Sequence, residues 1–211
     1  NEKLVRMVDD AQPDLICVTG DMHTRGDLQG RRVAEALIRR LCALAPVFFV
    51  PGEHDRDSTY LKALADSGAL IPDAAGIPFD VGRTHLRICG CSAAWFPPNC
   101  DLSERYRPQD DSPFQILLCH IPRPEAFAGA GIDLMLSGDS HGGLMRLPLL
   151  GCLYADGQLL PDLLQPDSAH WTHGAYELGD MTLWVNAGLG GIPARLFNRP
   201  EISVIRLVPD S

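Results

Sequence analysis

Four short apolar segments that each end in acidic or histidine residues constrain the fold of this chain more than any other feature. Each has the length and apolar content of a buried strand and is followed by a glycine or a tight turn. In open α/β sheets, ligands bind at the carboxyl ends of the strands. We therefore expect the polar groups to meet in one site. The groups are Gly20-Asp21 after DLICVT, Gly52-Glu53-His54-Asp55 after VFFVP, His120 after FQILLC, and Gly138-Asp139-Ser140-His141 after IDLML.

Periodicity predicts the elements between these segments. Val33, Leu37, Leu41 and Leu44 recur at helical spacing, so a helix is expected over about 28–45. Further helices are predicted over 2–11, 58–66 (with Ser58 as N-cap) and 124–129, and an irregular loop over 95–113. Strands are predicted over 14–19, 47–50, 77–81, 85–91, 114–119, 132–136, 182–186 and 202–207. This order favours an α/β fold, a two-sheet sandwich flanked by helices.

Composition limits the class of protein. The 211 residues, 45% of them hydrophobic, suffice for one domain over 1–211 without disulfides. The net charge of −9 argues against nucleic acid as a partner. The seven cysteines form no CxxC pair, so buried free thiols in a reducing compartment are expected rather than a zinc site. Residues 2–11 form a predicted helix with no strand before it, so we expect the domain to be N-terminally incomplete, lacking its first strand.

The mixture of carboxylates and imidazoles at the strand ends indicates metal chemistry. Such donors suit Mn, Fe, Zn or Mg. Two cations roughly 3.5–4 Å apart can share a bridging carboxylate and clamp a displacement at phosphorus. Asp21 is placed to be that bridge. His54 would donate a proton to the leaving group, with Asp55 orienting its ring; alternatively, Asp55 is a charge at the N-terminus of the following helix.

The order GD, G-E-H-D, a lone His and G-D-S-H-G-G resembles the calcineurin-like metallophosphoesterases along the whole chain. Their usual pattern is D-x-H, then G-D, then G-N-H-D or G-N-H-E, then His, then G-H-x-H. The resemblance implies the two-sheet fold and two divalent metal ions. It implies that Asp21 bridges both ions, that Glu53 replaces an asparagine ligand, that His120 binds the second ion and His141 the first, and that His54 is the general acid.

Three departures from that pattern affect the predicted metals. The D-x-H motif is absent, Glu53 stands in place of Asn, and Asp139 stands in place of the first His of G-H-x-H. The extra carboxylates favour harder metals such as Mn or Mg over Zn. The segments GGLMRLP and RLFNRPEI resemble the subgroup often tethered to membranes, so the expected partner is a phosphorylated small molecule or a lipid-linked phosphoester. Both a cytoplasmic location and a membrane association through a preceding segment stay open.

Two other functions remain open from the sequence. Gly138-Asp139-Ser140-His141-Gly142 matches G-x-S-x-G, the serine-esterase elbow, with Ser140 as nucleophile. A binding module that keeps the fold without catalysis is the third reading. Arg195 would either contact a phosphate or form an ordinary salt bridge. The possible triad partners of Ser140 are His170, His173, Asp156, Asp162 and Asp167, and the aromatic residues expected to line a substrate mouth or to pack under their loop are Trp95 and Phe96.

Overall fold

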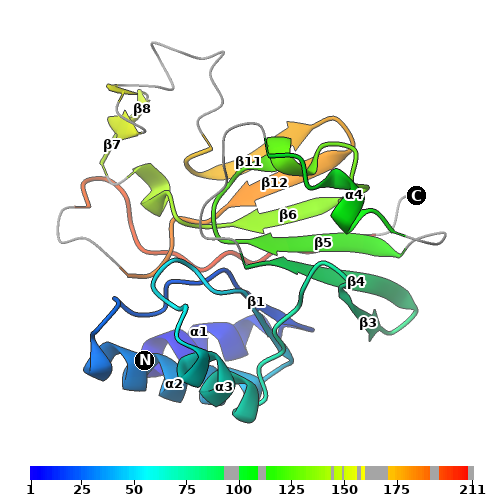
Figure 1. Ribbon diagram of the computed structural model, residues 1–211. Coiled ribbons are helices and arrows are strands. Elements are labelled where there is room, and N and C mark those ends of the chain that lie inside the picture. Colours follow the sequence, from blue (N-terminus) through cyan, green and yellow to red (C-terminus); the bar gives the residue numbers. More distant parts are fainter. Residues whose placement is uncertain are drawn as a thin grey trace.

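Helices and strands alternate through the first third of the chain in the computed structural model, which describes residues 1–92, 100–108, 113–143, 145–148, 150–155, 158–159, 171–190 and 195–208. Strands β1 and β2 pair in parallel, with Ile16 opposite Val47 and Val18 opposite Phe49. The three helices lie together on one side of this pair (Figure 1). The elements are α1 (Glu2–Ala11), β1 (Ile16–Val18), α2 (Leu28–Cys42), β2 (Val47–Phe49) and α3 (Ser58–Asp66).

A mixed six-stranded sheet forms the second layer (Figure 1). Its order is β11-β12-β6-β5-β4-β3, and the four central strands are parallel, so their carboxyl ends share one edge. Only the outer strands β3 and β11 run antiparallel to their neighbours. The strands are β3 (Ile77–Val81), β4 (Thr84–Cys91), β5 (Phe114–Cys119), β6 (Leu134–Ser137), β11 (Gly174–Leu178) and β12 (Met181–Val185).

Shorter elements connect and cover these layers. A single helical turn, α4 (Ser103–Tyr106), and the 3₁₀ turn η1 (Pro124–Phe127) lie over the six-stranded sheet. The 3₁₀ turn η2 (His141–Gly143) follows β6. Two small antiparallel pairs complete the described elements, namely β7 (Arg146–Leu147) with β8 (Gly151–Cys152) and β9 (Tyr154–Ala155) with β10 (Gln158–Leu159).

The core is divided among three apolar clusters, and the middle one joins the two sheets. Phe48 and Val50 from the β2 segment are fully buried against Ile88, Ile116 and Leu118 of the large sheet. Burial of one such aliphatic or aromatic side chain contributes about 1.5–3 kcal/mol. A second cluster packs α1, α2 and α3 on β1 and β2, and a third lies beneath α4 and η1. The predicted α/β sandwich flanked by helices is thereby confirmed.

Several local predictions differ from the structure. The N-cap of α3 is Asp57, not Ser58, because its Oδ1 accepts from the Thr59 and Tyr60 amides at 2.8 and 3.0 Å. Residues 202–207 form no strand; instead, the Ser203 hydroxyl accepts hydrogen bonds from Trp184 and Asn186 side chains at 2.8 and 2.7 Å. Helix α2 also ends at Cys42, before the predicted limit.

All seven cysteines are free thiols, but only four of them, Cys89, Cys91, Cys119 and Cys152, are buried as predicted. Burial of the thiol raises the pKa of Cys17 to about 12. Among the described residues, no helix combines the length and apolar character that a membrane span requires. Trp95 and Phe96 lie outside the described residues.

Candidate metal centre

Side chains from both sheets meet where their parallel strands end. Asp21 follows β1, His54 follows β2, His120 follows β5 and Asp139 follows β6. The His120 Nε2 atom lies 3.3 Å from Asp21 Oδ2 and 3.3 Å from Asp139 Oδ1. The His54 Nε2 atom lies 4.0 Å from the same Asp21 Oδ2. Asp21 is therefore shared by two groups of donors, as a bridging carboxylate requires.

His120 is oriented as a metal-binding histidine would be. Its Nδ1 lies 2.6 Å from the Thr19 carbonyl oxygen, which can only accept, so Nδ1 carries a proton. Its Nε2 is buried without a hydrogen-bond partner and faces two carboxylates, and only 4% of the side chain is exposed. Metal-bound histidines commonly donate their other ring N–H to a carbonyl in this way. A divalent cation at Nε2 would satisfy this nitrogen together with a neighbouring carboxylate oxygen.

The charge balance around His120 supports the same fit. Burial disfavours the imidazolium, but the adjacent carboxylates of Asp139 and Asp21 outweigh burial and raise the pKa of His120 to about 10. Two carboxylates thus hold a positive charge at this point, as a proton in the absence of metal. For Asp21, burial opposes ionisation, yet its contacts with His120 and the His54 amide lower its pKa.

The second group of donors is more open. Ligand atoms of Asp21, Glu53 and His54 all lie within 4.8 Å of one another. Glu53 is 59% exposed and its Oε1 lies 3.6 Å from His54 Nε2. The His54 Nδ1 accepts from the Arg25 amide at 3.3 Å, so in the neutral ring the proton is on Nε2, facing the carboxylates.

The loop geometry that brings these groups together depends on close backbone approach. Asp21, Asp139 and His141 have φ angles of 54°, 63° and 51°, in the left-handed region that costs free energy for residues other than glycine. A Cβ on Gly20 would overlap the backbone of Gly52, and a Cβ on Gly52 would overlap the Asp21 carboxylate. The two glycines are therefore needed for the loops after β1 and β2 to touch.

Asp55 fastens those two loops. Its buried carboxylate accepts from the amides of Asp21 and Gly52, the latter at 3.1 Å, and its other oxygen lies 3.8 Å from His23 Nε2. Burial raises the pKa of Asp55. In the structure the Asp55 carboxylate makes these contacts rather than one with the His54 ring, and the N-cap of α3 is Asp57.

The His23 side chain, which is 6% exposed, lies next to Asp55. Its ring meets Tyr60 edge-on with centroids 4.6 Å apart, and its Nδ1 lies 3.0 Å from the Thr24 carbonyl. A histidine two residues after the proposed bridging Asp21 was the only sequence signal for this position.

His141 and the C-terminal segment close the other side of the site. The Asn198 side chain donates from Nδ2 to the His141 carbonyl oxygen at 2.5 Å. Burial lowers the pKa of His141, and the charge of Arg195 adds to the effect, whereas the carboxylates of Asp139 and Asp21 act against it. The His141 ring therefore lies within the field of the other predicted ligands.

The geometry around Ser140 does not resemble a nucleophile elbow. The Ser140 hydroxyl donates to the Thr172 carbonyl oxygen at 2.6 Å. The segment after it is the turn η2 followed by β7, where an elbow needs a helix. His173 is bound to Glu201 through Nε2 at 3.0 Å. The other predicted triad partners, His170, Asp156, Asp162 and Asp167, lie outside the described residues.

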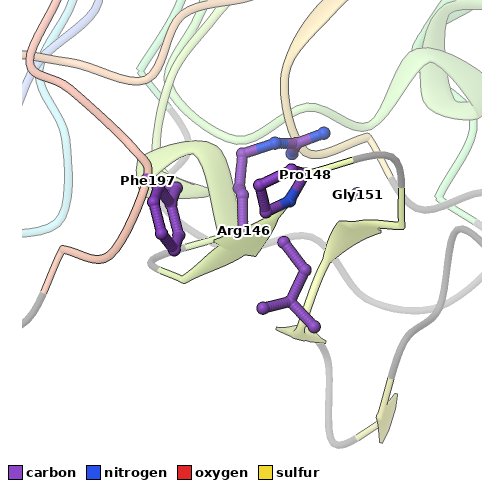
Figure 2. A pocket seen from close by; sticks show the side chains of 5 residues that line it. Arg146, Pro148, Gly151 and Phe197 are labelled. Atoms are coloured by element: carbon purple, nitrogen blue, oxygen red, sulfur yellow. The ribbon is translucent and has the colours of Figure 1, made fainter.

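A shallow groove adjoins the loop that carries His141. It has a volume of about 450 Å³ and is lined by Arg146, Leu147, Pro148, Gly151 and Phe197. In the view of Figure 2, Arg146 lies between Phe197 and Pro148. Phe197 is 69% exposed and has a φ of 50°, so an aromatic side chain is held in a costly backbone conformation at the groove.

Comparison with known proteins agrees with this geometry. The family model described as calcineurin-like phosphoesterase matches residues 1–143. The chain is 27% identical over 220 residues to the uncharacterized metallophosphoesterase YkuE of Bacillus subtilis, covering 97% of this chain and 71% of that protein. It is 25% identical over 209 residues to the phosphodiesterase YaeI of Escherichia coli, covering 93% of this chain and 71% of that protein.

The family match spans α1 to η2 and so includes every strand end that carries a predicted metal ligand. The order of the motifs along the chain agrees with that match. So does the position of His120 and His54 next to Asp21. The chain belongs to the calcineurin-like phosphoesterases, a family of metal-dependent hydrolases.

Proposed function

We propose that this protein hydrolyses a phosphoester bond with two divalent cations held by Asp21, Glu53, His120, Asp139 and His141. The observation that carries the proposal is the buried, unpartnered Nε2 of His120, placed 3.3 Å from two carboxylate oxygens. A divalent cation can replace the proton on this imidazole nitrogen and is attracted by both carboxylates. The family generally uses a dinuclear centre of this kind.

Each residue has a definable part in the reaction. When bound, the cation pair lowers the pKa of an attacking water and neutralises charge on the phosphoryl oxygens. Asp21 offers Oδ2 to both groups of donors while its Oδ1 accepts from the His54 amide at 2.9 Å. Thr19 holds the His120 ring in the tautomer that leaves Nε2 free. Asp55 keeps the Asp21 and Gly52 loops together by accepting hydrogen bonds from both of their amides.

His54 is the group suited to protonate the leaving alkoxide. Its Nδ1 accepts the Arg25 amide in the neutral ring, so the proton donor is the imidazolium, which returns to the neutral ring when it gives up a proton from Nε2. That atom faces Asp21 and Glu53, at the open side of the site where substrate would arrive. A proton supplied at this position prevents a full negative charge from developing on the leaving oxygen.

Two finer proposals concern the metal and the substrate. The three carboxylates, Asp21, Glu53 and Asp139, favour Mn or Mg over Zn. The groove at the segment after η2, which Leu147, Pro148 and Phe197 line together with Arg146, would take a phosphoester whose leaving group is apolar, such as a lipid-linked phosphodiester. One relative is named as a phosphodiesterase. The membrane association that the sequence predicts for a preceding segment stays a prediction.

The decisive experiment separates metal from serine chemistry in the full-length protein. Turnover of bis(p-nitrophenyl) phosphate should disappear after chelation and return when Mn²⁺ is added, with metal content following activity. Ser140→Ala should keep this activity, and a fluorophosphonate should fail to label Ser140. Activity that survives complete metal removal, or that ends with Ser140→Ala while metal content is unchanged, would contradict the proposal.

The substrate proposal has its own measurement. Phosphodiesters of equal leaving-group pKa but increasing alkyl length should show a falling KM if the groove takes the apolar part. Phe197→Ser should remove most of that dependence and leave turnover of the shortest ester near its original value. A KM independent of chain length would remove the support for an apolar leaving group.

A further inference from the structure

The Arg195 side chain is only partly satisfied by its surroundings. Its Nη2 donates to the carbonyl oxygens of Ala187 and Gly190 at 2.7 and 2.8 Å. Its Nε and Nη1 are buried and have no hydrogen-bond partner within the described part of the chain. A charged group buried with unpaired donors costs free energy unless a ligand of opposite charge completes it. The guanidinium is therefore held in place while its Nε and Nη1 donors lack hydrogen-bond acceptors.

Contacts on two sides hold Arg195 at the sheet edge where the candidate ligands follow β5 and β6. Strand β12 is parallel to β6, so the segment after β12 that contains Ala187 leaves the sheet at the same edge as Asp139. On the other side, the Arg146 amide donates to the Leu196 carbonyl at 2.9 Å, which ties the C-terminal segment to the loop that follows His141. Arg195 is thus held between the segment after β12 and the segment that follows η2.

The acidic residue near Arg195 is engaged elsewhere. The Glu201 carboxylate contacts His173 Nε2 at 3.0 and 3.1 Å, and its Oε1 also accepts from the Ala187 amide at 3.0 Å. Glu201 therefore compensates part of the charge of Arg195 without binding its free donors. An ordinary salt bridge, which the sequence left open for Arg195, does not use Nε or Nη1.

We propose that Arg195 is a substrate-binding residue whose free N–H groups bind non-bridging oxygens of the phosphoryl group and of the phosphate product. The proposal rests on the proposed function, because it places that phosphoryl group at the metal centre. Guanidinium groups form strong charge-assisted hydrogen bonds with phosphate oxygens. The positive charge also offsets the carboxylates of Asp21, Glu53 and Asp139, which would otherwise repel an anionic substrate. Arg195 lies beyond the segment 1–143 that the family model matches.

The test measures phosphate directly. The full-length protein, loaded with Mn²⁺, is titrated with inorganic phosphate by calorimetry, and product inhibition of bis(p-nitrophenyl) phosphate turnover is measured in parallel. Arg195→Ala should weaken phosphate binding about 10- to 100-fold, the range expected for lost hydrogen bonds to a charged group. Metal content should be unchanged. Arg199→Ala, an exposed arginine on the same segment, is the matched control and should behave as the wild type.

The outcomes are distinguishable. Equal phosphate affinity in the wild type and Arg195→Ala would overturn the Arg195 proposal and leave metal-dependent hydrolysis standing. A metal-loaded wild type that neither turns over the diester nor binds phosphate would overturn both. If Arg195→Ala unfolds, Arg195→Lys decides, because it keeps the charge and loses the guanidinium geometry: phosphate affinity should fall about 3- to 10-fold, and an unchanged affinity would contradict the proposal.

Discussion

The two halves of the metal centre differ in how firmly their donors are held. In the half formed by β5 and β6, His120 is 4% exposed and its ring is fixed by the Thr19 carbonyl. In the half formed by β2, Glu53 and His54 are 59% and 36% exposed. The first half is preorganised before any ligand arrives, whereas the second keeps side-chain freedom on the side that substrate would enter. Asp21 joins the two.

This difference separates binding from chemistry within one site. A buried ligand with a fixed tautomer loses little conformational entropy on metal binding, so it should dominate affinity. An exposed pair is screened by water and can follow the substrate, so it should affect turnover and metal choice more than retention of the metal. Four substitutions or titrations test that division, in falling order of expected effect.

Loss of the shared carboxylate should have the largest effect. Asp21→Ala removes an oxygen that lies next to donors of both halves, and metal assistance is worth several kcal/mol at the transition state, so kcat/KM should fall about a thousandfold or more. Metal analysis and diester turnover check it. Asp80→Ala, which removes an exposed carboxylate paired with His85, is the control and should change neither. If Asp21→Ala keeps both metal ions, Asp21 does not join the buried half and the open half of the site.

Metal affinity in the buried half should depend strongly on pH. Without metal, the pKa of His120 is raised to about 10, so at lower pH a proton must leave before Nε2 can bind a cation. Affinity should therefore rise with pH, by up to about tenfold per unit and roughly 100-fold from pH 6 to pH 8.

Calorimetry in two buffers with different ionisation enthalpies measures the released proton. His120→Gln, which has no titrating ring, should bind metal more weakly and lose this pH dependence. An equal pH dependence in His120→Gln would assign the proton to another group.

The open half should control leaving-group protonation. His54→Ala should reduce kcat about 100-fold for an alkyl phosphoester with a poor leaving group, within the range typical of general acids. It should reduce kcat only a few-fold for a p-nitrophenyl ester, whose leaving group needs no proton. His85→Ala, an exposed histidine on β4, serves as control. Equal losses on both substrates would argue for a metal-binding role of His54 instead.

Glu53 should give the smallest effect. Glu53→Gln keeps an oxygen donor but removes a charge that water already screens, so affinity for Mn²⁺ should fall about tenfold or less. Competition between Mn²⁺ and Zn²⁺ should shift towards Zn²⁺, as a less anionic site predicts. Glu104→Gln, on α4, is the control. A wild type that already retains only zinc would refute the predicted preference for harder metals.

Much of this molecule follows from patterns that are local in the sequence. Apolar segments and helical spacing predicted α1, α2, α3 and the parallel strands, because each element needs one buried face whatever packs against it. The polar residues at four strand ends likewise predicted a common site, since parallel strands in one sheet end at one edge. The order of the motifs identified the family before any contact was known.

Contacts between distant loops could not be obtained in that way. The bond from His120 to Thr19 joins residues 101 positions apart, and the link from Asp55 to the Asp21 amide joins residues 34 apart. The local sequence does not show whether Asp55 binds the amides of two loops or the ring of His54. The same holds for residues 202–207, whose apolar pattern resembles a strand although Ser203 bonds to the side chains of Trp184 and Asn186.

Residue type and order were thus enough to predict which chemistry this chain carries, because strand burial and metal-ligand preference act through individual segments. Folding was needed to select partners among those residues: which imidazole nitrogen is free, which carboxylate is shared, and where the guanidinium of Arg195 lies. These partners are set by contacts of a few ångströms between side chains on different loops. Such contacts form only when both sheets and the C-terminal segment are packed together.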